Sequence, residues 1–142
     1  MVELVIVLAI MGILSVTVIP MYSHMQAKSQ ATRNRANMEI IKDAFLNHFY
    51  HTYSMGTPSV PTPPDSLMTD EWCNSPMDST RGTKTPNDLF GSGEVPKNSN
   101  NVPFLYRSWI ETKSDGRQDR IIMIKDTDPD SPSYGEDETV II

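Results

Sequence analysis

The side chains best suited to chemistry are the carboxylates of the acidic stretch DTDPDSPSYGEDE near the end of the chain. Its aspartates recur at alternate positions and once more eleven residues after the first: Asp126, Asp128, Asp130 and Asp137. Alternating carboxylates offer the oxygen ligands that Ca²⁺ prefers. The stretch is not an EF-hand, because the sixth position of an EF-hand loop requires glycine and here holds Ser131, followed by Pro132. Two interpretations stay open: a looser calcium site that also uses backbone carbonyls, and an exposed acidic turn.

No other pattern indicates a catalytic site. The sequence has no Gly-rich phosphate loop, no G-x-S-x-G, no H-E-x-x-H and no Cys/His metal pattern. His48 and His51 have no second His, Cys and acid at ligand spacing, so both are interpreted as surface histidines. We therefore expect no enzyme and, calcium aside, no cofactor.

Charge and cysteine content exclude further classes. The net charge of −6 argues against nucleic-acid binding, because phosphate contacts need a basic stripe and only Lys28, Arg33 and Arg35 are clustered. Cys73 is the sole cysteine, so no intrachain disulfide can form. It is interpreted as a buried small apolar residue, with an interchain bridge or a modification as the alternatives.

The element that opens the chain is a long apolar stretch. No charged residue occurs from Leu4 to Ala27, and the run from Leu4 to Met21 would span about 27 Å as a helix, close to the thickness of a bilayer core. The run is longer than the apolar part of a secretory signal, and no basic residue precedes it. The basic residues that follow it would stay in the cytoplasm unless more positive charge preceded Met1. We therefore expect the chain to be the product of cleavage of a leader.

The helix is expected to continue to Ser54. Its second half places an apolar stripe at steps of three and four: Met38, Ile41, Phe45, Phe49 and Tyr53. This stripe should pack on a sheet. Gly56 and the four prolines of residues 55–66 should end the helix. The predicted organisation is a helix over residues 1–54, of which 1–22 form the membrane span or filament core, and a globular domain over residues 55–142.

The globular domain is predicted to be irregular first and a sheet last. Residues 66–73 could form a short helix capped by Ser66 or Thr69. Branched and aromatic runs at 102–113 and 119–126 predict an antiparallel hairpin, and 138–142 predicts a third strand. Alternation places Phe104, Tyr106 and Ile110 on one face of the first strand. The fold class is α+β: one long helix, a long irregular loop and a small antiparallel sheet of about three strands.

Three residues of the apolar helix do not suit a simple span. Glu3 costs about 2.5–3.5 kcal/mol if it lies deep in lipid, so it sits either at headgroup level or beside a cation, such as the N-terminal amine of another copy. Gly12 and Pro20 weaken the helix between them, because Pro20 has no amide hydrogen and blocks the carbonyl four residues back. Ser15 and Thr17 could cover backbone groups freed in this way. The segment should be helical in lipid and able to unwind locally in a protein bundle.

These residues carry a family resemblance. ELVIVLAIMGILSVTVIPMY resembles the N-terminal helix of the type IV pilin family, which includes the pseudopilins of type II secretion. Glu3 matches the glutamate that guides entry into the filament, Gly12 the glycine, and Pro20 the proline of the melted segment; Tyr22 matches an aromatic just beyond. The family's usual Phe-Thr or similar pair before Met1 and Val2 is absent, so we expect two mature residues to precede this numbering. The specific match covers about the first 25 residues.

The resemblance implies a bacterial structural protein. A membrane peptidase cuts the leader, the new N-terminus is methylated, and the subunit is stored in the inner membrane before an assembly platform there builds a helical homo-oligomer. A type IV pilus, an extracellular filament for adhesion, motility or DNA uptake, is the first expectation. The alternative is the major pseudopilin of a periplasmic secretion pseudopilus, where a similar acidic loop before the last strand binds calcium and no disulfide loop is present. A membrane-anchored binding module or enzyme is the second alternative.

Overall fold

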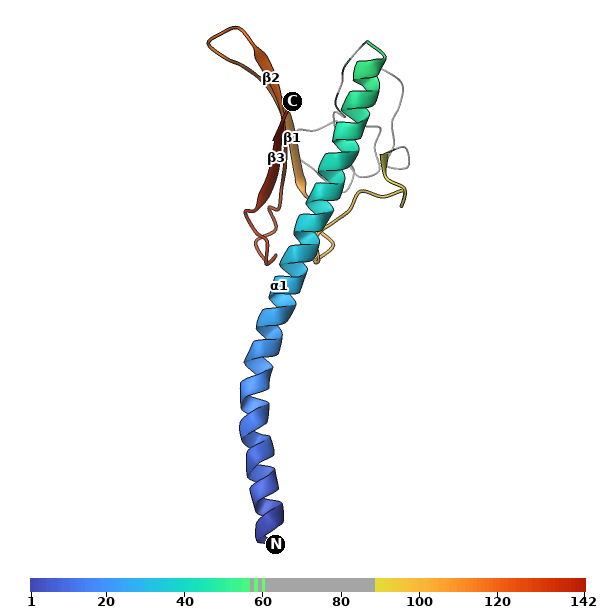
Figure 1. Cartoon of the computed structure of the whole chain (residues 1–142). Helices are drawn as coiled ribbons and strands as arrows, with labels where there is room; N and C mark the ends of the chain where they lie inside the picture. Colours follow the sequence, from blue (N-terminus) through green and yellow to red (C-terminus); the bar gives the residue numbers. More distant parts are fainter. Residues whose placement is uncertain (57, 59, 61–88) are drawn as a thin grey trace.

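The computed structural model of the chain describes residues 1–56, 58, 60 and 89–142. One helix, α1 (Val2–Ser54), is followed by three strands, β1 (Leu105–Thr112), β2 (Gln118–Lys125) and β3 (Asp137–Ile141). Figure 1 shows that α1 extends far beyond the globular part, which lies along its C-terminal half. Three sequence predictions lie outside the described residues: the helix at 66–73, the environment of Cys73 and most of the extended stretch at 55–66. Of that stretch, the structure describes only residues 55, 56, 58 and 60.

The end of α1 is set by local backbone chemistry. The carbonyls of the last helical turn have no partner within the helix. Met55 donates a backbone hydrogen bond to the carbonyl of Thr52, and Gly56 donates one to that of Tyr53. Gly56 has a φ of +83°, a left-handed conformation that glycine adopts without steric cost. The predicted end of the helix is therefore confirmed.

The strands form an antiparallel sheet in the order β1-β2-β3. The predicted hairpin is confirmed: β1 and β2 pair from Leu105↔Lys125 to Thr112↔Gln118, and Gly116, with a φ of +82°, forms the turn between them. The two strands start and end within three residues of the predicted ranges, and β3 is shifted by one residue from 138–142. The α+β fold class predicted from the sequence is correct.

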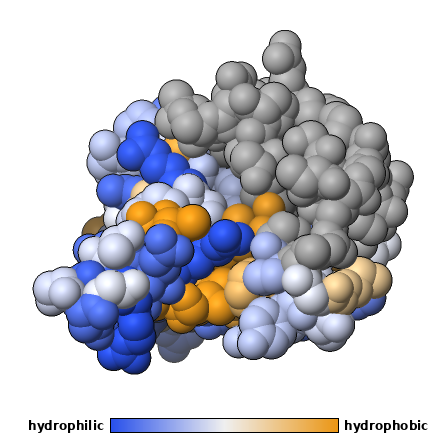
Figure 2. Space-filling model, turned by 90° about the horizontal axis from the view of Figure 1, so that it is seen from above, coloured by the Kyte–Doolittle hydropathy of each residue, from blue (hydrophilic) through white to orange (hydrophobic). Residues whose placement is uncertain are grey.

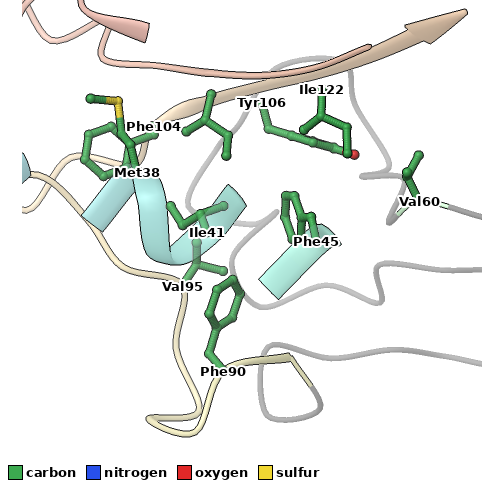
Figure 3. Packing of buried hydrophobic residues seen from close by; sticks show 10 residues of the cluster. Met38, Ile41, Phe45, Val60, Phe90, Val95, Phe104, Tyr106 and Ile122 are labelled. Atoms are coloured by element: carbon green, nitrogen blue, oxygen red, sulfur yellow. The ribbon is translucent and has the colours of Figure 1, made fainter. Parts of the chain in front are cut away.

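The core lies between α1 and the inner face of the sheet. Met38, Ile41 and Phe45 point from α1 toward the sheet in Figure 3, where Tyr106 and Ile122 meet them. The ring centroids of Phe45 and Tyr106 are 4.7 Å apart in an edge-to-face arrangement. The remaining buried apolar members come from the chain around the sheet and from β2: Val60, Phe90, Val95, Phe104 and Ile124.

The apolar stripe of the helix was predicted correctly only in part. Met38, Ile41 and Phe45 are buried, but Phe49 is half-buried and Tyr53 is 64% exposed. The buried face continues instead through His48 and Thr52, so the prediction of His48 as a surface residue is wrong. Phe104, which directly precedes β1, and Tyr106 on β1 are buried as expected, whereas Ile110 on the same strand is 52% exposed.

Candidate functional site

The N-terminal half of α1 is an apolar rod that extends away from the described globular part (Figure 1). Every residue from Met1 to Gln30 is exposed. Among the described residues, α1 is the one helix long and apolar enough to cross a membrane, and none of its apolar window is buried within the chain. Each exposed Val, Leu or Ile gains about 1.5–3 kcal/mol when it is fully buried. The rod, defined as residues 2–27, is therefore a surface that must be covered by lipid or protein.

Glu3 lies in the first turn of this rod. The helix N-terminus has no side-chain cap, and within the described part of the chain the Glu3 carboxylate forms no hydrogen bond or ion pair. An acid in the first turn interacts favourably with the helix dipole, by about 0.3–1 kcal/mol. That gain is smaller than the cost of placing a carboxylate deep in lipid. The charge therefore calls for water, headgroups or a cation from another molecule.

Gly12 and Pro20 do not interrupt the helix in this structure. Pro20 lies inside α1, and nothing lies within 4 Å of a Cβ placed on Gly12. Ser15 Oγ donates to Met11 O across 2.7 Å, and Thr17 Oγ1 donates to Leu14 O across 2.9 Å. Neither hydroxyl binds the carbonyl four residues before Pro20, which is the one that the proline leaves without a partner. A continuous helix through a proline is the state expected in lipid.

The rod joins the globular part at Asn34, the first fully buried residue of the helix. Its Nδ2 donates to Ser133 Oγ across 2.8 Å and to Ser131 Oγ across 3.0 Å, and lies 3.3 Å from Ser99 Oγ. Its Oδ1 accepts a hydrogen bond from the Ser99 backbone amide across 2.8 Å. One side chain of α1 thus holds the loop before β1 and the loop between β2 and β3.

Ser131 and Ser133 connect Asn34 to the buried carboxylate of Asp126. Ser131 Oγ and Ser133 Oγ donate to Asp126 Oδ2 across 2.5 and 2.6 Å. Asp126 Oδ1 accepts from the backbone amide of Asp128 across 3.1 Å, and Asn98 Nδ2 lies 3.4 Å away. Both oxygens of Asp126 therefore have donors from the protein itself, as a buried carboxylate requires.

Asp128 is held by two asparagines. Its Oδ2 accepts from Asn98 Nδ2 across 2.9 Å and from Asn100 Nδ2 across 2.8 Å. The amides of Asn100 and then Asn98 lower the pKa of the Asp128 carboxyl below its ordinary value, because they stabilise the charged form. We call Asn34, Asn98, Ser131, Ser133 and the two carboxylates Asp126 and Asp128 the Asn34 network.

The structure does not bring all four candidate calcium ligands, Asp126, Asp128, Asp130 and Asp137, into one group. Asp126 and Asp128 share Asn98, but Asp130 is exposed, and exposed Asp137 accepts a hydrogen bond from Thr139. Over the described residues, no group of three or more His, Cys, Asp or Glu side chains is placed to hold a metal ion. Asp126 and Asp128 lie in the loop between β2 and β3, and their carboxylate oxygens bind Ser and Asn donors. A looser calcium site that uses two of these carboxylates and backbone carbonyls stays a prediction.

The sequence analysis missed the neutral members of the Asn34 network. Asn34 does carry a signal, since it lies four residues before Met38 on the buried line of the helix. Asn98, Ser131 and Ser133 belong to loops whose meeting point depends on the folded chain, so no local pattern identifies them.

Comparisons add no family assignment to this geometry. No protein-family model matches the chain, and no curated protein or solved structure matches it either.

Proposed function

We propose that the chain is a structural subunit of a helical filament of the type IV pilus kind. The observation that carries the proposal is the exposed apolar rod with an unpaired carboxylate, Glu3, in its first turn among the described residues. Lipid covers the rod before assembly, and the rods of other copies cover it afterwards. Burial of the apolar rod against its copies drives the process, and no catalytic step by the subunit is needed.

Glu3 favours assembly over simple anchoring. An anchor gains only the small interaction with the helix dipole from a carboxylate at its apolar end. A subunit also gains a pairing with a cation supplied by a neighbour, for which the N-terminal amine is suited. Pro20 fits the same role, because a helix without one backbone hydrogen bond can stretch locally when protein replaces lipid. The resemblance to pilins rests on these residues and on Gly12.

The globular part faces outward in such a filament. Figure 2, seen from above, shows a largely hydrophilic described surface with an apolar area at its centre, in contrast to the predominantly apolar rod. The subunit is stored in the inner membrane of a bacterium, cleaved by a prepilin peptidase and added to the filament by an assembly platform. Adhesion, motility and DNA uptake are the activities that a surface filament of this kind serves.

A major pseudopilin of type II secretion is the second candidate. The observation that favours it is the loop between β2 and β3, which is acidic, lies before the last described strand and is held to the helix by Asn34 without a disulfide. The two candidates differ in where the filament ends. Electron microscopy of cells that produce the chain separates them, because pilus filaments extend beyond the cell surface and pseudopili stay in the periplasm.

The assembly role of Glu3 is tested by comparing the parent chain with Glu3→Ala and with Glu94→Ala, a matched removal of an exposed carboxylate from the globular part. We expect Glu3→Ala to enter the membrane normally and to give far fewer filaments, and Glu94→Ala to behave as the parent. Normal filament yield from Glu3→Ala would remove the role assigned to this residue.

If the chain is instead a membrane-anchored binding module or enzyme, it should not assemble into filaments. Its helix serves only as an anchor, so folded monomers should persist in detergent and no filaments should form. A chain without residues 1–24 would then keep its full activity. That combination of results would replace the filament proposal.

A further inference from the structure

A short stretch of α1 separates the apolar rod from the globular part. The rod ends at Ala27, and Asn34 is the first fully buried residue of the helix, so residues 28–33 belong to neither. We call residues 28–33 the neck. The neck covers about 9 Å of helix and lies where α1 leaves the globular part (Figure 1). Lipid that covers the rod therefore ends beside the neck.

The neck is basic, although the chain as a whole is acidic. Lys28 and Arg33 are exposed, and neither forms an ion pair with another described residue. No Asp or Glu occurs between Glu3 and Glu39, whereas the net charge of the chain is −6. The free positive charge thus lies directly at the end of the rod, and the acids of the helix lie beyond it.

The two free cations lie on different sides of the helix. Lys28 and Arg33 are five residues apart, which places them about 140° apart around the helix axis. A single rigid partner on one side of α1 would meet only one of them, whereas a bilayer surrounds the helix and reaches both. The next cation, Arg35, is already engaged, because its Nη2 lies 3.1 Å from Glu136 Oε2.

The length of the rod places the neck at the membrane surface. Glu3 and Lys28 are 25 residues apart, or about 38 Å along the helix. The hydrocarbon core of a bilayer is about 30 Å thick, and the bilayer with its headgroups about 40–45 Å. When the rod fills the core, both charges therefore lie among headgroups of opposite leaflets. Arg33 lies about 7.5 Å beyond Lys28, and its long side chain leans back toward the N-terminus and the same headgroups.

The chemistry of the neck selects anionic phospholipid. Phosphate oxygens are strong acceptors for Lys and Arg donors. In a zwitterionic headgroup an ammonium group compensates the phosphate, whereas phosphatidylglycerol keeps a net negative charge. A basic residue near an anionic membrane surface gains roughly fivefold in affinity. The acidic residues of the globular part are repelled by the same surface, so this attraction belongs to the neck.

We propose that the neck binds anionic phospholipid headgroups while the subunit is stored in the membrane, with Lys28 and Arg33 contacting phosphates on different sides of the helix. The proposal rests on the membrane-stored subunit of the proposed function and names the lipid class that it selects. The contact fixes the depth of the rod, because movement along the membrane normal takes both cations away from the phosphates. It does not compete with the pairing of Glu3 with a neighbour's amine, since that pairing forms when the rod leaves lipid.

Lipid selection by the full chain tests the proposal. Vesicles of phosphatidylcholine carry the chain with spin-labelled phosphatidylglycerol or spin-labelled phosphatidylcholine, and electron paramagnetic resonance measures the fraction of each label held at the protein. The parent should prefer phosphatidylglycerol about fivefold. Lys28→Gln with Arg33→Gln should lower this preference to about onefold, because no free cation then remains in the neck. Arg107→Gln with Arg117→Gln, which removes two exposed cations from the β1–β2 hairpin, is the matched control and should keep the parent's preference.

Two further measurements separate charge from side-chain shape. Raising the ionic strength from about 0.01 M to about 1 M shortens the screening length from about 30 Å to about 3 Å and should remove most of the parent's preference. The exchange Lys28→Arg with Arg33→Lys keeps both charges and should keep the preference. Loss of the preference in this exchange would overturn a contact based on charge.

Other results would also overturn the lipid contact. A parent without a preference for phosphatidylglycerol would do so, and so would an equal preference in the parent and in Lys28→Gln with Arg33→Gln. Equal loss in that variant and in the control would assign the preference to net charge alone and overturn the role of the neck.

Filament yield, measured separately, distinguishes this proposal from the proposed function. A parent that prefers phosphatidylglycerol but forms no filaments would contradict the filament function alone. A parent that forms filaments without any lipid preference would contradict the lipid contact alone. If filament yield then also falls in Lys28→Gln with Arg33→Gln, the two cations serve contacts between copies instead of lipid.

Discussion

The side-chain amide of Asn34 donates a hydrogen bond to the hydroxyl of Ser133 across 2.8 Å, although 99 residues separate the two in the chain. That hydroxyl in turn donates to the buried carboxylate of Asp126 across 2.6 Å. Asn34 is also the first fully buried residue of α1. The contact therefore fixes the point at which the exposed rod leaves the globular part.

Replacing Asn34 by Ala should lower the free energy of unfolding by about 1–3 kcal/mol, because the Ser99 amide and the two serine hydroxyls lose a buried partner. Chemical unfolding of the full chain in detergent measures the change. Asn47→Ala, on an exposed position of the same helix, is the control and should change stability by less than about 0.5 kcal/mol. Equal effects of the two substitutions would show that the network contributes nothing specific.

Asp128 should make stability depend on pH in the acidic range. Its pKa is lowered in the folded chain, by the amide of Asn100 first and then by that of Asn98, so the folded state binds its proton less readily than the unfolded state does. The stabilisation is complete above the ordinary carboxyl pKa of 3.8 and is lost as the pH falls through the lowered value. Asp128→Asn should flatten this part of the stability profile. A variant profile as steep as that of the parent would contradict the assignment.

The fold was predictable because its patterns are local. The apolar residues Met38, Ile41 and Phe45 of the buried face follow a three-four spacing, and the strands are runs rich in branched and aromatic residues. The error at Phe49 and Tyr53 has a geometric cause: two successive four-residue steps each overshoot a full turn by about 40°. Three-four steps from Phe45 keep to the same side and lead to His48 and Thr52, which are the buried residues.

The candidate site was predictable only at its charged and apolar residues. Glu3 and Pro20 are conspicuous inside an apolar run, whatever the rest of the chain does. The partners of Asp126 are different, because Asn98 and Ser133 reach it only after two loops have folded onto α1. The acidic pattern suggested a cation, and it could not show that the chain itself supplies neutral donors to Asp126 and Asp128.

Neither the addition of Ca²⁺ nor its removal with a chelator should change the melting temperature of the full chain. Both oxygens of Asp126 accept hydrogen bonds from the chain, so an ion would have to displace donors such as Ser131 and Ser133. Thermal unfolding in detergent, with excess Ca²⁺ and with a chelator, measures this. Asp126→Ala should lower the melting temperature equally in both conditions. A chelator-dependent decrease that disappears in Asp126→Ala would restore the calcium site.

The ion pair between Lys42 and Glu138 should contribute more to the free energy of unfolding than the more exposed pair between Arg35 and Glu136. The two side chains are only 20% and 23% exposed, and their 3.0 Å contact ties α1 to β3. A double-mutant cycle with Lys42→Met and Glu138→Gln should give a coupling of about 1 kcal/mol in the full chain at neutral pH. The same cycle for the more exposed Arg35 and Glu136 should give a value near zero.

The Lys42 coupling should also have a characteristic pH dependence. The hydrogen bond to Glu138 raises the pKa of Lys42 above 10.5, so the folded state holds this proton more tightly than the unfolded state. The stabilisation is therefore complete below 10.5 and is lost as the pH rises through the raised value. Urea unfolding across the alkaline range, with Lys42→Met as the reference, measures the loss. A coupling that persists after Lys42 has lost its proton would show that packing, and not charge, joins the two residues.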